Sequence, residues 1–427
     1  MSSTLSSRPI GVAGAAAPAS TGVFAGVGSG RIVSLDIMRG LVMVIMALDH
    51  TRDFFTNLRF EPENLAQTYY ALFFTRWITH FCAPLFFFLA GTGAFFYGMR
   101  RTPQALSRFL WTRGLWLIFI EFTVVGTAWT FMVPWGFFAV IWCLGACMVM
   151  MAAIVRMPLR WVAAFSGVLI LGHDLLDPIR PRQFGSFAWL WTILHVRGGL
   201  LVPLVHIRSF VLFPLVPWIG VMAAGYVFGS VYLVEKERRR KLIAKIGLGL
   251  TLAFILLRLT NLYGNPPVGL GGVSQGPWHV QPTLQKTIIL FFDVEKYPPS
   301  LQYLLMTLGP SLLLLAWLDK KLDQRDGKRS VSPWLSPLLT FGRVPLFFYI
   351  LHLYLIHSLA VLVGVLSHQP VTWLFQGGFI FGAPDEWGFN LPFVYLMWIT
   401  AVLILYFPCR WYEGVKRRRK DWWLSYI

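Results

Sequence analysis

The sequence predicts an all-α, polytopic transmembrane bundle of about ten helices, with both chain termini in the cytoplasm. The first observation is compositional: 56% of the 427 residues are hydrophobic and only 13% are charged, about half the charged fraction of an ordinary soluble protein. The second is that basic residues gather in short clusters between apolar runs, as in loops that face the cytoplasm. The net charge of +18 therefore does not indicate nucleic acid binding.

Ten apolar stretches are long enough to cross a hydrocarbon core about 30 Å thick. They lie near 34–56, 72–98, 107–128, 131–152, 159–175, 210–233, 242–262, 298–318, 338–366 and 390–412. Clusters of Lys and Arg follow every second stretch, and the segment before the first stretch is also basic. Since an even number of spans returns the chain to its starting side, this alternation predicts that both termini are cytoplasmic.

The composition of the segments outside these stretches predicts two tails and two long loops. Residues 1–30, rich in Ala, Ser and Gly, are expected to be a disordered cytoplasmic tail, and residues 413–427 a basic cytoplasmic tail. Residues 31–412 form the transmembrane domain. Two long loops, 176–209 and 263–297, lie on the outer side and are expected to cover the bundle as a vestibule.

Ionisable residues inside the apolar stretches are the candidate functional residues, because charged groups are costly in a bilayer and mark sites there. Arg39 and His50 are eleven residues apart in the first stretch. On a helix they project from nearly one face, roughly 16 Å apart along the axis. Asp36, Asp49 and Asp53 lie close enough in the sequence to tune them.

Three other stretches carry similar groups. His80 and Glu121 are expected at a depth comparable to that of His50. The ninth stretch places Arg343 near the cytoplasm and His352 about 13 Å above it, and so repeats the layout of the first. No histidine or carboxylate accompanies the cysteines at metal-ligand spacing, so no metal site is predicted.

Alternatives to a catalytic role remain open at this point. Buried polar residues also hold membrane helices together through hydrogen bonds, which would make the protein a non-catalytic scaffold. The same residues in a transporter or channel would form a proton or substrate path. An internal repeat, typical of transporters, is not visible in the sequence.

Several segments resemble one family of membrane enzymes. Residues 31–40, followed by 46–50, resemble the opening of the heparan-alpha-glucosaminide N-acetyltransferase catalytic-domain family, and similar segments recur further along the chain. They are 84–91, 217–220, 296–300 and 341–352. The resemblance to bacterial members covers about residues 31–412. The arginine and histidine spacing of the first span also resembles that of the membrane acyltransferase family 3.

These resemblances imply a bacterial cytoplasmic-membrane acyltransferase. It would move an acyl group, expected to be acetyl, from cytoplasmic acyl-coenzyme A to an extracytoplasmic glycan or similar acceptor. The bilayer and the acceptor are the implied partners, an oligomer is allowed, and neither a metal nor nucleic acid is expected. The lysosomal member of the family has its active histidine between spans one and two, but residues 51–79 here contain no histidine.

The catalytic prediction therefore falls on His50 as general base or transient acyl carrier. His80 is the second choice, and either His80 or Glu121 is expected to orient His50. His352 completes the predicted catalytic group. The predicted cofactor-binding residues sit on the first and ninth stretches, where the arginines would contact the phosphates of coenzyme A. They are Arg39, Arg343, Asp36 and Tyr349.

Overall fold

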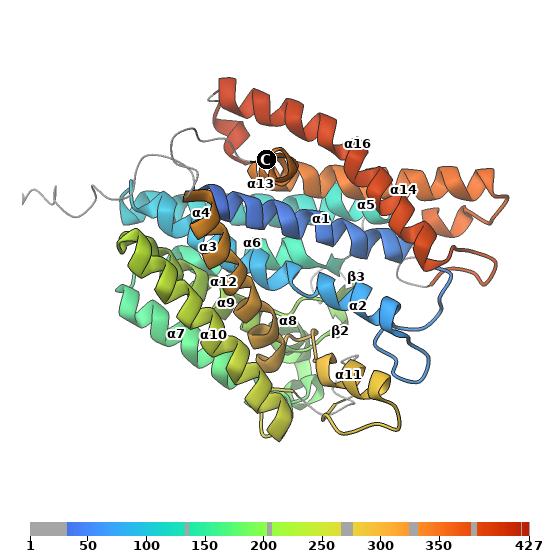
Figure 1. The fold of residues 1–427 in the computed structure, drawn as a ribbon, viewed down its shortest axis with the longest axis horizontal. Coiled ribbons are helices and arrows are strands. Elements are labelled where there is room, and N and C mark those ends of the chain that lie inside the picture. Colours follow the sequence, from blue (N-terminus) through green and yellow to red (C-terminus); the bar gives the residue numbers. More distant parts are fainter. Residues whose placement is uncertain are drawn as a thin grey trace, which may run out of the picture.

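Helices make up most of the protein, which confirms the predicted all-α transmembrane bundle (Figure 1). The computed structural model describes residues 32–132, 136–202, 207–265, 276–323, 332–376, 382–419 and 421–426, so the tail predicted at 1–30 lies outside the described residues. The helices are α1 (Val33–Phe55), α2 (Tyr70–Thr79), α3 (Cys82–Gly98), α4 (Pro103–Ile120), α5 (Gly126–Thr130), α6 (Val140–Ile154), α7 (Leu159–Gly172), α8 (Ala188–His195), α9 (Leu215–Gly229), α10 (Lys236–Thr260), α11 (Leu284–Phe292), α12 (Leu301–Asp323), α13 (Ser336–Arg343), α14 (Pro345–Leu366) and α16 (Leu391–Arg418). In Figure 1, α1 runs across the middle of the bundle, between α13, α14 and α16 on one side and α9, α10 and α12 on the other.

Eight helical segments of the described chain are long and apolar enough to cross a membrane. They correspond to eight of the ten predicted spans, and some combine two neighbouring helices, as α2 and α3 do in Tyr70–Gly98. The other two predicted spans contain α1 and α6. The start predicted at 131 for the fourth span was wrong, because α6 begins at Val140 and Phe137–Phe138 form a strand. α1 has 23 residues but carries five charged side chains, and α6 is apolar but has only 15 residues. Both still pack inside the bundle, α1 against α13 and α14 and α6 against α4 and α9.

The ninth predicted span is divided into two helices. α13 ends at Arg343, α14 begins at Pro345, and Val344 between them has φ −130° and ψ 49°. A residue before proline avoids the helical conformation because its backbone clashes with the proline ring, which explains the break. Arg343 and His352 therefore lie on successive helices.

Two glycines allow α1 and α13 to cross at very short distance. A Cβ atom at Gly40 would lie 1.8 Å from the carbonyl oxygen of Leu338, and one at Gly342 would lie 1.7 Å from that of Asp36. A residue with any side chain would force the backbones apart. The crossing also brings Arg39 Nη1 to 3.3 Å from the Gly342 carbonyl oxygen, to which it donates.

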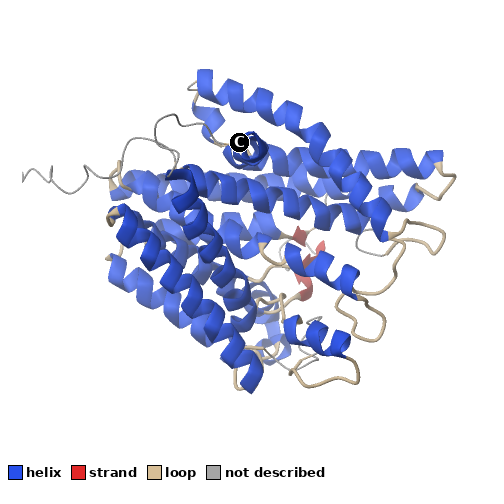
Figure 2. Cartoon of the chain, in the orientation of Figure 1, coloured by secondary structure: helices blue, strands red, loops and turns tan. Residues whose placement is uncertain are grey.

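A three-stranded sheet was not predicted. It consists of β1 (Phe137–Phe138), β2 (Gly198–Val202) and β3 (Ile207–Val211), in the order β1-β3-β2, with β1 parallel and β2 antiparallel to β3. Figure 2 shows it as a small patch among the helices. β2 begins with two glycines, which strands usually avoid, so the sequence carried little signal for it. The long loop predicted at 176–209 therefore contains ordered structure next to the bundle.

Candidate active site

His50 and His352 face each other from two helices at the centre of the candidate site. His50 lies near the end of α1, and His352 lies in the first half of α14. Nδ1 of His50 is 2.7 Å from Nε2 of His352, and the two rings have centroids 5.0 Å apart and planes inclined by 19°. His352 is fully buried, whereas His50 is half-buried. The structure thus brings two of the predicted catalytic residues into direct contact.

The hydrogen bonds of His352 determine which nitrogen of each neutral ring carries the proton. Nδ1 of His352 lies 3.1 Å from the carbonyl oxygen of Phe348, which can only accept, so this nitrogen donates. Nε2 of the neutral His352 ring then accepts from Nδ1 of His50. Nε2 of His50 keeps its lone pair, and no described residue forms a hydrogen bond with it. His50 is therefore held in the tautomer that a general base requires.

His50 lines a cavity of about 570 Å³, a volume in the range of small-molecule sites. Trp129 meets the His50 ring edge-on, with the centroids 4.8 Å apart, and Tyr349 does so at 6.3 Å. Both aromatic residues also line the cavity. The two long loops predicted on the outer side contribute Arg197 and Lys296 to its wall. The cavity therefore combines an imidazole, aromatic surfaces and cationic side chains.

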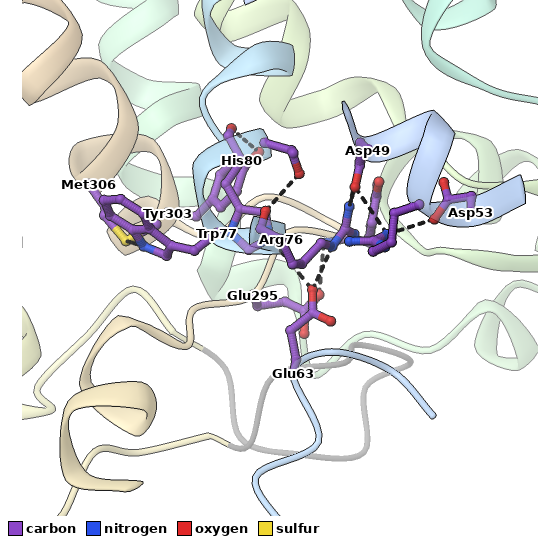
Figure 3. A network of polar contacts seen from close by, with 12 residues as sticks. Asp49, Asp53, Glu63, Arg76, Trp77, His80, Glu295, Tyr303 and Met306 are labelled. Carbon is purple, nitrogen blue, oxygen red and sulfur yellow. Dashed lines mark hydrogen bonds and ion pairs between the residues drawn. The ribbon is translucent and has the colours of Figure 1, made fainter. Parts of the chain in front are cut away.

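A chain of buried charges continues from the end of α1 to α2 (Figure 3). Nη1 of Arg76 lies 3.0 and 2.7 Å from the two carboxylate oxygens of Asp49, and its Nε lies 2.9 Å from Oε1 of Glu63. Nη2 of Arg52 lies 3.0 Å from Asp49 and 2.6 Å from Asp53. Since each arginine is shared by two carboxylates, the cost of burying these charges is offset by their mutual attraction. This chain of buried charges fixes α1 against α2 and against the loop that carries Glu63.

Glu63 lies outside the spans, in the loop between α1 and α2. Burial alone would raise the pKa of its carboxyl, but the charge of Arg76 and the nearby His80 outweigh burial and hold that pKa well below its usual range. Glu63 therefore stays ionised at neutral pH. It acts as a fixed counter-charge for Arg76.

His80 belongs to the other end of this charge chain. Its Nε2 lies 3.5 Å from Oε1 of Glu63, and its carbonyl oxygen accepts a hydrogen bond from the Tyr303 hydroxyl at 2.7 Å (Figure 3). The His80 side chain is buried. The position beside His50 that was expected for His80 or Glu121 is occupied by His352.

Glu121 begins a short π-helix, η1 (Glu121–Val125), between α4 and α5. Its Oε2 accepts a hydrogen bond of 2.8 Å from the backbone N–H of Trp142, in the first turn of α6. The first N–H groups of a helix have no partner within the helix, so a carboxylate there satisfies one of them. This contact gives Glu121 a structural role as a cap for α6.

The predicted cofactor-binding residues lie mostly at the opposite end of α1. Arg39 donates to Asp36 at 2.9 Å as well as to Gly342. Arg343 forms an ion pair with Glu413 and lines a second cavity, of about 660 Å³. Three more arginines line it: Arg410, Arg417 and Arg418.

Tyr349 is the exception among the predicted cofactor-binding residues, because it lines the cavity of His50. The two cavities have no lining residue in common. In the part of α1 between them, Met43 and Met46 are buried, and Met46 also lines the His50 cavity. Methionine side chains are flexible and adapt their packing readily.

None of the five cationic residues that line the His50 cavity was predicted as a site residue; they are Arg52, Arg59, Arg76, Arg197 and Lys296. Arg76 sits inside the second apolar stretch, so the rule that selected Glu121 applied to it equally. Lys296 lies in a loop segment, 296–300, that was noted only for its resemblance to the family. No group of three or more His, Cys, Asp or Glu side chains in the described chain is arranged to hold a metal ion.

Comparison with known proteins supports the resemblance seen in the sequence. Residues 31–257 match the family model described as "Heparan-alpha-glucosaminide N-acetyltransferase, catalytic". No curated protein matches the chain. The match covers α1 to most of α10 and so includes His50, His80 and Glu121, while His352 and Arg343 lie beyond it.

Proposed function

Because the chain belongs to the heparan-alpha-glucosaminide N-acetyltransferase catalytic family, we propose that it transfers an acetyl group from cytoplasmic acetyl-coenzyme A to an extracytoplasmic glycan or similar acceptor. The family supports acetyl transfer, and the eight apolar helices support a multi-pass membrane protein. The alternation of basic connections supports an orientation with both termini in the cytoplasm. The resemblance to bacterial members of the family supports a place in the cytoplasmic membrane of a bacterium.

The contact between His50 and His352 is the observation that carries this proposal. It links the Phe348 carbonyl, His352 and His50 in one line of hydrogen bonds that ends at the free Nε2 of His50. An acyl transfer to a hydroxyl or amine needs a base of this kind within reach of the acceptor. The His50 ring lines a cavity in which an acceptor can lie.

The proposed reaction follows from this geometry. The acceptor oxygen or nitrogen attacks the thioester carbonyl of acetyl-coenzyme A while Nε2 of His50 takes its proton. The tetrahedral intermediate then expels the coenzyme A sulfur, and the imidazolium returns the proton to that sulfur, so that the products are the acetylated acceptor and free coenzyme A. His352 acts as a positioning residue, because it holds His50 in one tautomer and does not itself line the cavity.

The donor would enter from the other end of α1. Arg343 and the three arginines around it form a cationic cavity suited to phosphate groups. Arg39 and His50 are eleven residues apart on α1, about 16 Å along the axis, which is of the order of the length of a pantetheine arm. The thioester would pass between the cavities along Met43 and Met46, whose side chains would move aside.

The test is acetyl transfer by the purified protein in lipid nanodiscs. Radiolabelled acetyl-coenzyme A and a panel of amino sugars and glycans are supplied, and labelled acceptor is measured for the wild type, His50→Ala and His279→Ala. His279 is an exposed histidine of the outer loop and serves as the matched control. We expect His50→Ala to lose activity by about 10²- to 10⁴-fold while His279→Ala keeps it. Equal transfer by the wild type and a folded His50→Ala protein would remove His50 from the mechanism.

A further inference from the structure

Lys296 is a buried cation on the wall of the His50 cavity. It lies in the segment between α11 and α12, and only 4% of its surface is exposed. Its ammonium lies 5.1 Å from the centre of the Tyr297 ring. Within the described chain it forms neither an ion pair nor a hydrogen bond with a carboxylate.

The other buried cations of this cavity are compensated. Arg76 is shared by Asp49 and Glu63, and Arg52 by Asp49 and Asp53. Burying a charge without a contacting partner is costly. Asp49 attracts Lys296 through space, but both arginines already contact that carboxylate. A negatively charged ligand in the cavity would therefore be the first anion in direct contact with Lys296.

Arg197 is a second cation on the same wall with aromatic neighbours. Its guanidinium carbon lies 5.3 Å from the centre of the Tyr297 ring and 5.8 Å from that of Phe210. Lys296 and Arg197 therefore lie against the same tyrosine. Cation–π contacts hold a cation in place but supply no counter-charge, so a negatively charged ligand can still pair with both side chains.

The remaining charged residues on the wall do not neutralise this pair. Arg59 donates to the carbonyl oxygens of Pro384 and Trp387, both at 2.5 Å, and so adds a further positive charge. Glu61 also lines the cavity, but its side chain is exposed to solvent. The cavity therefore presents an excess of positive charge next to His50.

We propose that Lys296 and Arg197 form an anion-binding subsite for the acceptor, which accordingly carries a phosphate or carboxylate group besides the hydroxyl or amine that is acetylated. This inference rests on the proposed function, because it assigns the outer cavity to the acceptor. The anion would lie between the two cations and hold the reacting group toward His50.

Binding to the purified protein in nanodiscs tests the subsite directly, by calorimetry with two matched probes. Glucosamine 1-phosphate carries the anion, and methyl glucosaminide is its neutral counterpart. We expect the wild type to bind the phosphate at least about 10-fold more tightly. Lys296→Met should weaken phosphate binding by about 10- to 100-fold with little effect on the neutral sugar, and Lys296→Arg should restore it. Lys286→Met removes a lysine of α11 that does not line the cavity, and should bind as the wild type does.

A third probe identifies the source of the anion. Adenosine 3′,5′-bisphosphate carries phosphates of the donor, and its binding should be unchanged in Lys296→Met. If that variant instead loses the bisphosphate and keeps the sugar phosphate, the subsite belongs to coenzyme A and the inference falls. It also falls if the wild type binds the charged and neutral sugars equally, or binds neither.

Transfer measured on the same samples separates this inference from the proposed function. Acetylation of both sugars with equal efficiency would retain the acetyltransferase and overturn the charged acceptor. Tight, Lys296-dependent binding of the sugar phosphate without acetylation of any acceptor would retain the subsite and overturn the proposed function. Binding of methyl glucosaminide serves as the folding control. If Lys296→Met binds this neutral sugar as the wild type does, the variant is folded, and its loss of phosphate binding is due to the missing ammonium group.

Discussion

Arg76 forms an ion pair with Asp49, in which Nη1 of the arginine donates to both carboxylate oxygens, at 3.0 and 2.7 Å. The pair joins α2 to α1 at the residue directly before His50. Its position makes the charge chain a support for the candidate base, since any movement of the end of α1 would displace His50 from His352.

Arg76→Met should destabilise the protein by about 3–5 kcal/mol, because it leaves Asp49 and Glu63 buried without their shared cation. Thermal unfolding in nanodiscs measures the effect. Adding Asp49→Asn and Glu63→Gln to the same chain should recover much of the loss. If Arg76→Met alone were as stable as the wild type, the chain of buried charges would contribute little to the stability of the protein.

Glu63 gives a pH dependence with a definite sign. Its pKa is lowered in the folded protein, whereas a glutamate in an unfolded chain titrates near about 4.3. The stabilisation by ionised Glu63 is therefore fully present above about pH 4.3 and is lost as the pH falls further. The difference in melting temperature between the wild type and Glu63→Gln should stay constant from pH 8 to 6 and shrink below about pH 4.3. A difference that grew on acidification would contradict this assignment.

Gly40→Ala should separate α1 from α13, because the new Cβ would overlap the Leu338 carbonyl oxygen. The expected cost is about 1–3 kcal/mol in stability, together with a higher KM for acetyl-coenzyme A as Arg39 moves from Gly342. Gly93→Ala is the matched control, since a Cβ at Gly93 on α3 meets nothing within 4 Å. Unfolding curves and initial rates for the two variants are compared. Identical behaviour would argue against a close crossing.

His352→Ala tests the positioning of His50. We expect kcat to fall by about 10- to 100-fold with little change in KM, because His50 loses the partner that fixes its tautomer. The pH–rate profile should also shift, since the base would titrate without the neighbouring imidazole. A purely structural role would lower the melting temperature and leave the shape of the profile unchanged.

Arg343→Gln tests the donor cavity. The expected result is an increase of about 10- to 100-fold in the KM for acetyl-coenzyme A, with kcat nearly unchanged. The KM for S-acetylpantetheine, which lacks the nucleotide phosphates, should stay the same. Arg100→Gln, an exposed arginine in the turn between α3 and α4, is the control. If the KM rose equally for both donors, Arg343 would not contact the nucleotide phosphates of coenzyme A.

Local patterns in the sequence were enough to predict the helices and their membrane environment. The apolar stretches and their basic connections depend on residues near one another in the chain. Each of the ten predicted spans contains a helix, and eight helical segments are long and apolar enough to cross a membrane, although strand residues precede the helix in the spans predicted at 131–152 and 210–233. The spacing of Arg39 and His50 likewise follows from the pitch of a single helix. The family resemblance arose from the same short segments and agrees with the match over residues 31–257.

The identity of the partner of each candidate residue was decided only by the tertiary structure. His50 and His352 are 302 positions apart, and nothing in the local sequence distinguishes His352 from His80 or Glu121 as the neighbour of His50. Helix packing places Glu121 against the start of α6 and His80 next to Glu63, and it leaves Lys296 without a direct carboxylate contact in the described chain. Helix formation depends on hydrogen bonds a few residues apart, whereas a site in a bundle depends on which helix faces meet, and that is a property of the whole packed chain.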